Sequence, residues 1–428
     1  MKKKVLVFPC GSQAAIELNF ALRYAVRIEL YGASSVEDHG AYVYKNYIGG
    51  LPNIKSNDFI DNFNAVLKKY EIDFIIPTHD TVALFLVENE SQLVSKVVSS
   101  SLETVKVCRF KSLTYQRFSS EIFVPNIYKT VESVDRYPVF LKPDDGQGGK
   151  GTHVASSETE VEFYLKRSPN LLICEYLPGE EISIDCFTSL KGELKFVNAR
   201  TRDRTLGGIS TESRIIPLTR EIEYAAEVIN AQLEFRGYWF FQMKKDYRGK
   251  YKLLEISSRF AGTSVLSYAR DVNLPLATLL EFMGIEVEIN SNKYNVTLDR
   301  SLINRYRLDI EYMRVYVDLD DTLIVNGKVN KIILMYLYQC INENKEIILI
   351  TRHEKNLGET LYKYKISDKL FTEIVHINAS DLKSSYIRED MPAIFIDNSF
   401  AERMEVRKKR NIPCFDVNNV ECLIDWRD

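Results

Sequence analysis

Two segments limit most strongly how this chain can fold. In each, a short apolar strand is followed directly by polar, charged or glycine residues of the kinds that bind or transfer phosphate groups. The first spans residues 138–151, where the strand-like run 139–142 precedes the sequence Gln-Gly-Gly-Lys-Gly. The second spans 315–323, where an apolar strand ends at Asp318. At ~150 residues a domain, 428 residues suffice for about three domains. The sequence therefore predicts a multidomain chain with two separate sites.

Residues 1–105 are predicted to form a doubly wound α/β domain. Apolar strand-like runs alternate there with stretches of helical spacing, which predicts a parallel sheet with helices on both faces. The strands are expected at 4–8, 28–31 and 73–77, and the helices at 14–27 and 82–88. Ligands bind such sheets at the carboxyl ends of the strands, so Thr78, His79 and Asp80 are candidate substrate contacts. His79 is equally compatible with a loop histidine that has no role.

Residues 106–300 are predicted to form an α+β domain, because glycine clusters separate short β-rich pieces. These pieces lie at 139–142, 171–175, 182–188, 195–200, 239–244 and 252–256. Residues 290–309 are polar and lack a regular period, so they are the expected linker. Residues 313–428 again alternate strands (315–317, 346–350, 393–396) with helices (331–344, 357–364), which predicts a compact Rossmann-like α/β domain. The predicted fold class is a multidomain mixture of α/β and α+β.

The composition is that of a globular protein and argues against a nucleic-acid-binding or membrane protein. Hydrophobic residues make up 45% and charged residues 27%, as in ordinary globular proteins. The net charge of −3 gives no electrostatic reason to expect a nucleic acid or an anionic membrane as the main partner. No apolar run approaches the ~20 residues of a membrane span, and the apolar start ends at Phe8, too early for a signal peptide. The seven cysteines form no C-x-x-C pair, so we expect reduced thiols and a cytoplasmic protein.

Glycines near residue 148 predict a phosphate-binding loop. Lys142 ends an apolar strand, and Gly148 and Gly149 follow in a run whose backbone N–H groups can approach phosphate oxygens closely. A flexible hairpin without a ligand is the alternative interpretation. The strand-borne lysine favours phosphate binding, because it adds a positive charge beside the loop.

A second group of polar residues predicts a metal site in the same domain. Gln242 and Glu255 lie on two strands that we expect to pair. Ser257 and Arg259 follow Glu255 at alternate positions, which places the three side chains on one face. Oxygen ligands beside an arginine suit Mg²⁺ and an anionic reacting group. The alternative is a solvated strand with surface ion pairs.

In this order the motifs resemble the ATP-grasp superfamily, in particular its carbamoyl-phosphate-synthase-like and carboxylate–amine ligase branch, over roughly residues 1–300. The resemblance implies that ATP activates a small-molecule carboxylate for attack by an amine or, less often, a thiol. It also implies ATP and Mg²⁺ (or Mn²⁺) as cofactors, and the homodimers common among relatives. The implied nucleotide ligands are Lys111 and Lys142 at the phosphates, Gly148 and Gly149 in the glycine-rich loop, Glu175, Tyr176 and Leu177 at adenine, and Glu181 at the ribose. The implied metal ligands are Gln242, Glu255 and Ser257, with Arg259 as the catalytic arginine.

Ser257 departs from the pattern of that superfamily. Asn usually stands two residues after the metal-binding glutamate, and a hydroxyl is a shorter and weaker ligand than an amide oxygen. We therefore expect a second metal to bind less tightly or through water. Glu255 and Arg259 are both present, so we still expect chemistry at this site.

Three arginines lie before a glycine pair at 207–208. Arg200, Arg202 and Arg204 are spaced alternately, so a strand would aim them to one side. We expect Arg200, and with it Arg202, to contact phosphate or a substrate carboxylate. A solvated basic strand is the alternative.

Three strand ends within 313–428 predict a phosphoryl-transfer centre. Asp318 and Asp320 follow the first strand, where one carboxylate can attack phosphorus and the other can carry a proton. Carboxylates this close repel each other and need cations or donors nearby. Lys383 is the candidate cation, and Thr351, Asp397 and Asn398 are the polar residues that follow the other two strands. Strand-end acids that act only as caps are the alternative.

These motifs resemble the haloacid dehalogenase (HAD) superfamily of phosphohydrolases. The resemblance implies that Asp318 is the nucleophile and Asp320 the general acid and base. It makes Thr351 and Lys383 stabilisers of the phosphoryl group. It also implies a Mg²⁺ site formed by Asp318, Asp320 and Asp397, supported by Asn398 or Glu402. Gaps of 33 positions from Asp318 to Thr351 and 32 from there to Lys383 leave no room for a large cap, which predicts an open site for a phosphoester.

The leading hypothesis from the sequence is a bifunctional enzyme that joins an ATP-dependent ligase (1–300) to a phosphatase (313–428). One alternative keeps only the phosphatase active, with the ATP-grasp part as a nucleotide-binding regulatory module. Another has the ATP-grasp part phosphorylate an acceptor that is not a carboxylate.

Overall fold

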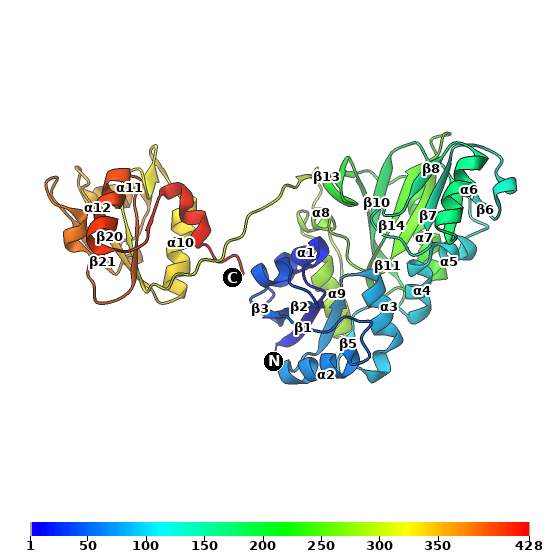
Figure 1. Cartoon of the computed structure of the whole chain (residues 1–428), viewed down its shortest axis with the longest axis horizontal. Helices are drawn as coiled ribbons and strands as arrows, with labels where there is room; N and C mark the ends of the chain where they lie inside the picture. Colours follow the sequence, from blue (N-terminus) through cyan, green and yellow to red (C-terminus); the bar gives the residue numbers. More distant parts are fainter. Residues whose placement is uncertain (1, 428) are drawn as a thin grey trace. The chain divides into compact units, whose positions relative to one another are not determined.

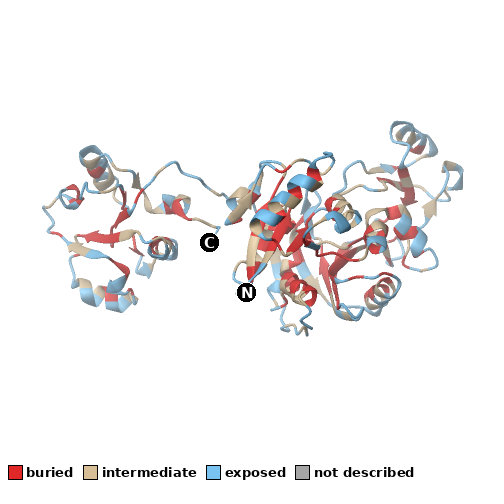
Figure 2. Cartoon of the chain, turned by 90° about the horizontal axis from the view of Figure 1, so that it is seen from below, coloured by how far each residue is buried: buried red, intermediate tan, exposed pale blue. Residues whose placement is uncertain are grey.

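The computed structural model describes residues 2–427 and divides the chain into two compact units, 1–302 and 303–428 (Figure 1). Each unit has its own buried core (Figure 2). Among the described residues, no helix has the length and apolar character required to cross a membrane.

The first unit begins with a five-stranded parallel sheet of order β3-β2-β1-β4-β5. Its strands are β1 (Lys3–Phe8), β2 (Ile28–Ala33), β3 (Asn46–Ile48), β4 (Phe74–Pro77) and β5 (Lys96–Val97), and its helices are α1 (Gln13–Leu22), α2 (Phe59–Tyr70) and α3 (Asp80–Glu88). The apolar residues of β1 are at most 1% exposed, as expected for a central strand covered on both faces. Helices α1 and α3 start directly after the neighbouring strands β1 and β4, where the strand order reverses. Ligands bind parallel sheets at this point.

Two antiparallel sheets complete the first unit. The smaller has the order β6-β9-β7-β8, and the larger has the order β12-β13-β11-β10-β14-β15, with β16 paired to β13. The smaller sheet contains β6 (Ile127–Tyr128), β7 (Val139–Pro143), β8 (His153–Ala155) and β9 (Leu171–Glu175). The larger contains β10 (Glu181–Thr188), β11 (Leu194–Thr201), β12 (Arg204–Leu206), β13 (Ile209–Ile216), β14 (Gly237–Lys245), β15 (Tyr251–Ser257) and β16 (Thr297–Asp299). The accompanying helices are α4 (Leu102–Arg109), α5 (Lys111–Arg117), α6 (Glu158–Arg167), α7 (Arg220–Gln232), α8 (Val265–Tyr268) and α9 (Leu274–Phe282).

One hydrophobic cluster joins the parallel sheet to the larger antiparallel sheet. It contains Val7 of β1 and Leu18 of α1 together with Tyr238 of β14 and Leu279 of α9, all at most 2% exposed. Each fully buried side chain of this size contributes about 1.5–3 kcal/mol by leaving water. This shared core explains why residues 1–302 form a single compact unit. It also fixes the ends of β1 and β4 against the antiparallel sheet that carries the predicted metal ligands.

The second unit is a five-stranded parallel sheet of order β21-β20-β17-β22-β23 with helices between its strands. Its elements are β17 (Arg314–Val317), β18 (Ile324–Val325), β19 (Lys328–Val329), α10 (Lys331–Asn342), β20 (Glu346–Thr351), α11 (Leu357–Tyr364), β21 (Glu373–His376), β22 (Ala393–Ile396), α12 (Phe400–Arg410) and β23 (Cys414–Phe415). Strands β17, β20 and β22 lie side by side and run the same way, so their carboxyl ends share one edge. The short hairpin β18–β19 follows β17 directly.

Three expectations from the sequence need correction. The expected linker 290–309 includes the boundary between the two units after Leu302, but its first part contains strand β16, which pairs with β13 and extends the larger sheet. The helix expected at 14–27 ends at Leu22, because Tyr24 and Val26 are 74% and 81% exposed and give a longer helix no buried face. The three alternating arginines do not share one strand, since the chain leaves β11 after Thr201 and starts β12 at Arg204.

Candidate functional site

A cavity of about 800 Å³ lies in the first unit. The starts of α1 and α3 contribute to its wall, as do the loop after β7 and the strands β10, β11, β14 and β15. Several predicted site residues line it, namely Lys111, Lys142, Gly148, Gly149, Glu181, Arg200, Gln242, Glu255 and Arg259. Glu175, Tyr176 and Leu177 lie outside this lining, at the end of β9 and in the turn after it, and their assignment to adenine stays a prediction. Ser257, the last residue of β15, also lies outside the lining.

Two lysines enter the cavity from the smaller sheet and from α5. Lys142 is 6% exposed, and its Nζ donates to the Tyr115 hydroxyl and to the Leu254 carbonyl oxygen. Lys111 Nζ donates to the Gly146 carbonyl oxygen at 2.7 Å and lies 4.0 Å from Glu255 Oε2. Burial lowers the pKa of both ammonium groups, with partial opposition from nearby acidic groups. An incoming phosphate would therefore meet two cations that are poorly compensated inside the protein.

The glycine-rich loop meets a second glycine turn over the cavity. Gly148 and Gly149 have φ values of +60° and +71°, and Gly208 in the β12–β13 turn has φ +80°. A Cβ atom on Gly208 would lie 2.5 Å from the Gly148 Cα. Only glycine fits at this contact, because the backbone conformation is left-handed and the two main chains almost touch. The two turns thus form a joint boundary of the cavity.

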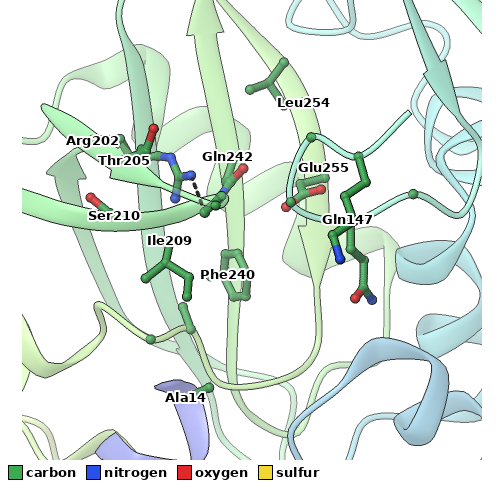
Figure 3. A pocket seen from close by; sticks show the side chains of 18 of the residues that line it. Ala14, Gln147, Arg202, Thr205, Ile209, Ser210, Phe240, Gln242, Leu254 and Glu255 are labelled. Atoms are coloured by element: carbon green, nitrogen blue, oxygen red, sulfur yellow. Dashed lines mark hydrogen bonds between the residues drawn. The ribbon is translucent and has the colours of Figure 1, made fainter. Parts of the chain in front are cut away.

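Gln242 and Glu255 are direct partners in the β14–β15 ladder, as the sequence predicted from strand pairing. Gln242 lies between Arg202 and Glu255 in Figure 3, and its amide end is 3.2 Å from Glu255 Oε1 and 3.3 Å from Arg202 Nη1. Two neighbouring ligands of an octahedral Mg²⁺ at about 2.1 Å lie about 3 Å apart. In the orientation that satisfies both neighbours, the Gln242 amide nitrogen donates to Glu255 Oε1 and the amide oxygen accepts from Arg202 Nη1. A cation held by both residues would require the amide to turn its oxygen toward Glu255. Their role as ligands stays a prediction.

Asp80, the first residue of α3, brings the parallel sheet into contact with this site. Asp80 Oδ1 accepts a hydrogen bond from Ser257 Oγ at 2.8 Å, and Oδ2 accepts from Arg259 Nε at 2.8 Å. The same Oδ2 accepts from Gln147 Nε2 of the glycine-rich loop at 2.6 Å. Burial raises the pKa of Asp80, but Arg259 and the hydrogen bonds more than offset this, so the pKa lies below its usual value. Asp80 is therefore an ionised carboxylate beside the predicted catalytic arginine.

Arg202 takes part in the site through Glu181. Arg202 Nε lies 2.6 Å from Glu181 Oε1, and Arg202 Nη2 donates to the Gly208 carbonyl oxygen at 3.0 Å. Arg202 thus connects the expected ribose ligand with the glycine turn above the cavity. A nucleotide ribose that binds Glu181 would meet a carboxylate already held by this arginine.

Arg200 has a different environment from the one we expected. Its guanidinium is 1% exposed, and Nε and Nη2 donate to the two oxygens of Asp185 at 2.7 and 3.1 Å. Its Nη1 donates to Thr263, and Asp185 also accepts from the Tyr238 hydroxyl. This bidentate pair occupies most of the donors of Arg200, although the residue borders the cavity. Contact of Arg200 with phosphate stays a prediction. In the structure Arg200 has a different role, as the partner of the buried carboxylate of Asp185.

The second unit brings its predicted residues together at the carboxyl ends of β17, β20 and β22. Lys383 Nζ donates to Asp318 Oδ1 at 2.7 Å and to Asp397 Oδ2 at 2.6 Å, and all three side chains are at most 8% exposed. Burial raises the pKa of Asp318 to about 6, and Asp397 adds to this effect while Lys383 opposes it. One lysine for two buried carboxylates leaves negative charge uncompensated. A divalent cation fits this donor set.

Asp320 has a partner that the sequence analysis missed. His353 Nδ1 lies 3.0 and 2.9 Å from the two oxygens of Asp320, and Nε2 lies 2.7 Å from Thr360 Oγ1. The backbone N–H of His353 donates to Thr351 Oγ1 at 3.2 Å. His353 stands two positions after the strand-end Thr351, and this position was the signal that sequence analysis could have used. The imidazole orients the carboxylate that was predicted to act as acid and base.

Asn398 and Glu402, which were expected to support the metal site of the second unit, both have partners within the protein. Asn398 accepts from Thr322 Oγ1 at 3.3 Å through its side chain and donates its backbone N–H to the same oxygen at 3.1 Å. Glu402 is paired with Arg352 at 2.7 Å. Within residues 2–427, no group of three or more His, Cys, Asp or Glu side chains is arranged to hold a metal ion by itself. Any ion at either site would therefore also need ligands from water or substrate.

Comparisons with known proteins match part of the first unit. A family model described as "ATP-grasp in the biosynthetic pathway with Ter operon" matches residues 167–301. The chain contains an ATP-grasp region. A carbamoyl-phosphate synthase from Methanobrevibacter smithii is 29% identical over 144 residues, which is 32% of this chain and 38% of that protein. A D-alanine–D-alanine ligase from Fusobacterium nucleatum is 33% identical over 63 residues, or 15% of this chain and 22% of that one.

A solved structure supports the same ATP-grasp fold. The biotin carboxylase–β,γ-ATP complex from Campylobacter jejuni aligns with a TM-score of 0.58 and 14% identity, covering 69% of this chain and 75% of that one. ATP and Mg²⁺, the expected cofactors, are those that ATP-grasp enzymes use. The chain spans well under half the length of the two curated relatives it matches. The shared fold therefore does not transfer their substrates.

Proposed function

We propose that residues 1–302 form an ATP-dependent ligase that activates a small-molecule carboxylate for attack by an amine or a thiol. The observation that carries this proposal is the convergence of the Gln242–Glu255 pair, Arg259 and two buried lysines on one cavity. Oxygen donors, an arginine and lysines together suit a phosphoryl group in transfer. The homodimer and the cytoplasmic location expected from the sequence remain part of the proposal.

In this proposal, the carboxylate oxygen of the substrate attacks the γ-phosphorus of ATP, and the bond from that phosphorus to the ADP oxygen breaks. An amine then attacks the acyl carbon, phosphate leaves and the nitrogen loses a proton. Lys111 and Lys142 bind the phosphates, and Arg259 neutralises charge on the transferring group. Mg²⁺, when bound at Gln242 and Glu255, supplies further charge neutralisation. The turns at Gly148 and Gly208 exclude water from the activated carboxylate.

The test is carboxylate-dependent release of ADP by the full chain. We expect Glu255→Gln to lower this rate at least about 100-fold, because a metal ligand that acts on the transferring group is lost. Glu286→Gln is the matched control, since Glu286 is exposed and its ion pair is with Lys191. Equal rates in the two variants would rule out the assigned role of Glu255. ADP release that needs no carboxylate would instead favour phosphorylation of another acceptor.

We further propose that residues 303–428 form a HAD-type phosphatase that uses Asp318 as the nucleophile. The Asp318–Lys383–Asp397 cluster favours this second function, since a buried carboxylate attacks phosphorus well when a lysine and a cation neutralise its surroundings. Asp320, oriented by His353, would protonate the leaving oxygen, and Thr351 would hold the phosphoryl group. The substrate is an unidentified phosphoester.

Hydrolysis of p-nitrophenyl phosphate by the full chain tests the second proposal. We expect Asp318→Asn to lower the rate at least about 1000-fold, as loss of a nucleophile does in other enzymes. Asp368→Asn is the control, because Asp368 is exposed and is not one of the predicted site residues. Unchanged hydrolysis in Asp318→Asn would contradict the assignment. If phosphatase activity is present but ADP is never released, the first unit acts instead as a nucleotide-binding regulatory module.

A further inference from the structure

We propose that Asp80 is a positioning residue of the ATP site, which aims Arg259 and makes the Ser257 hydroxyl a metal ligand. This proposal rests on the proposed ATP-grasp function of the first unit. Asp80 is the first residue of α3, which follows strand β4 of the parallel sheet. In the sequence it stands 177 positions before Ser257. Its carboxylate nevertheless contacts three separate parts of the candidate site.

The first effect concerns the orientation of the Ser257 hydroxyl. A hydroxyl group has one hydrogen to donate and two lone pairs to offer. Ser257 is 4% exposed, and its Oγ hydrogen is directed to Asp80 Oδ1 at 2.8 Å. One lone pair receives a long contact from the Arg259 backbone N–H at 3.4 Å. The other lone pair is left for a cation on the face of β15 that also carries Glu255.

This arrangement offsets the departure of the sequence from its superfamily. Ser257 stands where an asparagine is usual, and a serine oxygen is a weaker ligand. A carboxylate that accepts the hydroxyl hydrogen increases the electron density on that oxygen. Partners of this kind, which orient and polarise a metal ligand, typically change metal affinity or activity by about 10–100-fold when they are removed.

The second effect concerns Arg259. Its Nε donates to Asp80 Oδ2 at 2.8 Å, and its Nη1 donates to the Phe260 carbonyl oxygen at 3.2 Å. Among residues 2–427, Arg259 Nη2 has no hydrogen-bond partner, and the side chain lines the cavity. Asp80 thus holds Nε, the Phe260 carbonyl oxygen holds Nη1, and Nη2 is left to an anionic group. Fixing the donor before the reaction lowers the cost of stabilising charge in the transition state.

The third effect connects the glycine-rich loop to the same carboxylate. Gln147 Nε2 donates to Asp80 Oδ2 at 2.6 Å, on the oxygen that also binds Arg259. Gln147 also lines the cavity. Asp80 therefore joins the glycine-rich loop to the carboxylate oxygen that holds the catalytic arginine.

Binding of Mn²⁺ in the presence of the non-hydrolysable nucleotide AMP-PCP tests the proposal without turnover. We expect Asp80→Asn to weaken Mn²⁺ binding, measured by electron paramagnetic resonance, by about 10–100-fold. Glu88→Gln is the matched control, because it removes a carboxylate from the other end of α3, where the partner is Lys106. Binding by Asp80→Asn within twofold of Glu88→Gln would overturn the proposal.

A rescue experiment separates positioning from a general loss of structure. Asparagine at 257 brings its own amide oxygen, so Ser257→Asn should restore tight Mn²⁺ binding to the Asp80→Asn variant. No restoration by this substitution would count against the proposed role. If Asp80→Asn does not fold, Ser257→Ala alone carries the test, and Mn²⁺ affinity equal to that of the wild type would overturn the proposal.

The outcome for Asp80 is independent of the outcome for the ligase. Absence of carboxylate-dependent ADP release by the wild-type chain would refute the proposed function, while the Mn²⁺ titrations would still decide whether Asp80 supports the metal ligand. Conversely, an active ligase whose Mn²⁺ affinity is the same in Asp80→Asn and Glu88→Gln would refute only the inference about Asp80.

Discussion

The buried pair of Arg200 and Asp185 gives the sharpest prediction about stability. Arg200 is 1% exposed and Asp185 is fully buried, and two hydrogen bonds join them. Removal of one partner leaves the other charge buried without compensation, which typically costs about 3–5 kcal/mol. We expect Arg200→Met and Asp185→Asn each to lower the free energy of unfolding of the first unit by about this amount. The double variant should lose less than the two single losses combined, because the partners are coupled.

Tryptophan fluorescence during urea unfolding can measure this loss in the first unit alone. The chain has two tryptophans, and Trp239 lies in the core of the larger sheet, whereas Trp426 belongs to the second unit. In a Trp426→Phe background the signal therefore reports on the first unit. Arg204→Met is the matched control, since the exposed pair of Arg204 with Asp299 should contribute less than about 1 kcal/mol.

The same variants decide between two roles for Arg200. A loss below about 1 kcal/mol in both Arg200→Met and Asp185→Asn would refute the structural role. If Arg200→Met were as stable as the wild type but bound AMP-PCP at least tenfold more weakly, the role predicted from the sequence, contact with phosphate, would hold instead.

Three further predictions concern the two sites. Gly208→Ala should weaken AMP-PCP binding in a calorimetric titration, because its Cβ would lie 2.5 Å from the Gly148 Cα. Gly192→Ala is the control, because Gly192 also has a positive φ, +84°, but an added Cβ there would have no other atom within 4 Å. It should leave AMP-PCP binding unchanged. Equal effects of the two substitutions would contradict the contact between the two glycine turns. Lys142→Met should raise the dissociation constant for AMP-PCP about 10–100-fold, because one charge-assisted hydrogen bond to the nucleotide is lost. An unchanged dissociation constant would exclude a contact between Lys142 and phosphate. Lys383→Met should abolish phosphatase activity and lower the melting temperature of the second unit, since two buried carboxylates lose the cation that they share. Hydrolysis by this variant at the wild-type rate would contradict the role of Lys383.

Local sequence patterns predicted those parts of the site that depend on neighbouring residues. Gln242 and Glu255 belong to consecutive strands, so a short hairpin was enough to bring them opposite each other. Asp318 and Asp397 follow adjacent parallel strands, whose carboxyl ends meet at one edge by geometry. In both cases strand periodicity and order determine which side chains meet.

Contacts between distant segments could not be derived in this way. Asp80 meets Ser257 and Arg259 only because a hydrophobic cluster packs the parallel sheet against β14 and α9. Alternate spacing suggested that Arg200 faces a ligand, but periodicity cannot tell that Asp185 on the neighbouring strand already takes its guanidinium. Helix α7 was also missed, although its apolar face packs on the larger sheet.

Trapping of the activated carboxylate tests the central claim most directly. The Asp318→Asn variant, in which the second site should be silent, would be incubated with ATP, Mg²⁺, pooled carboxylates and hydroxylamine. We expect release of ADP together with an equal amount of a hydroxamate, formed when hydroxylamine attacks the acyl phosphate. ADP release without any hydroxamate, or no ADP from any pool, would contradict a carboxylate ligase in the first unit.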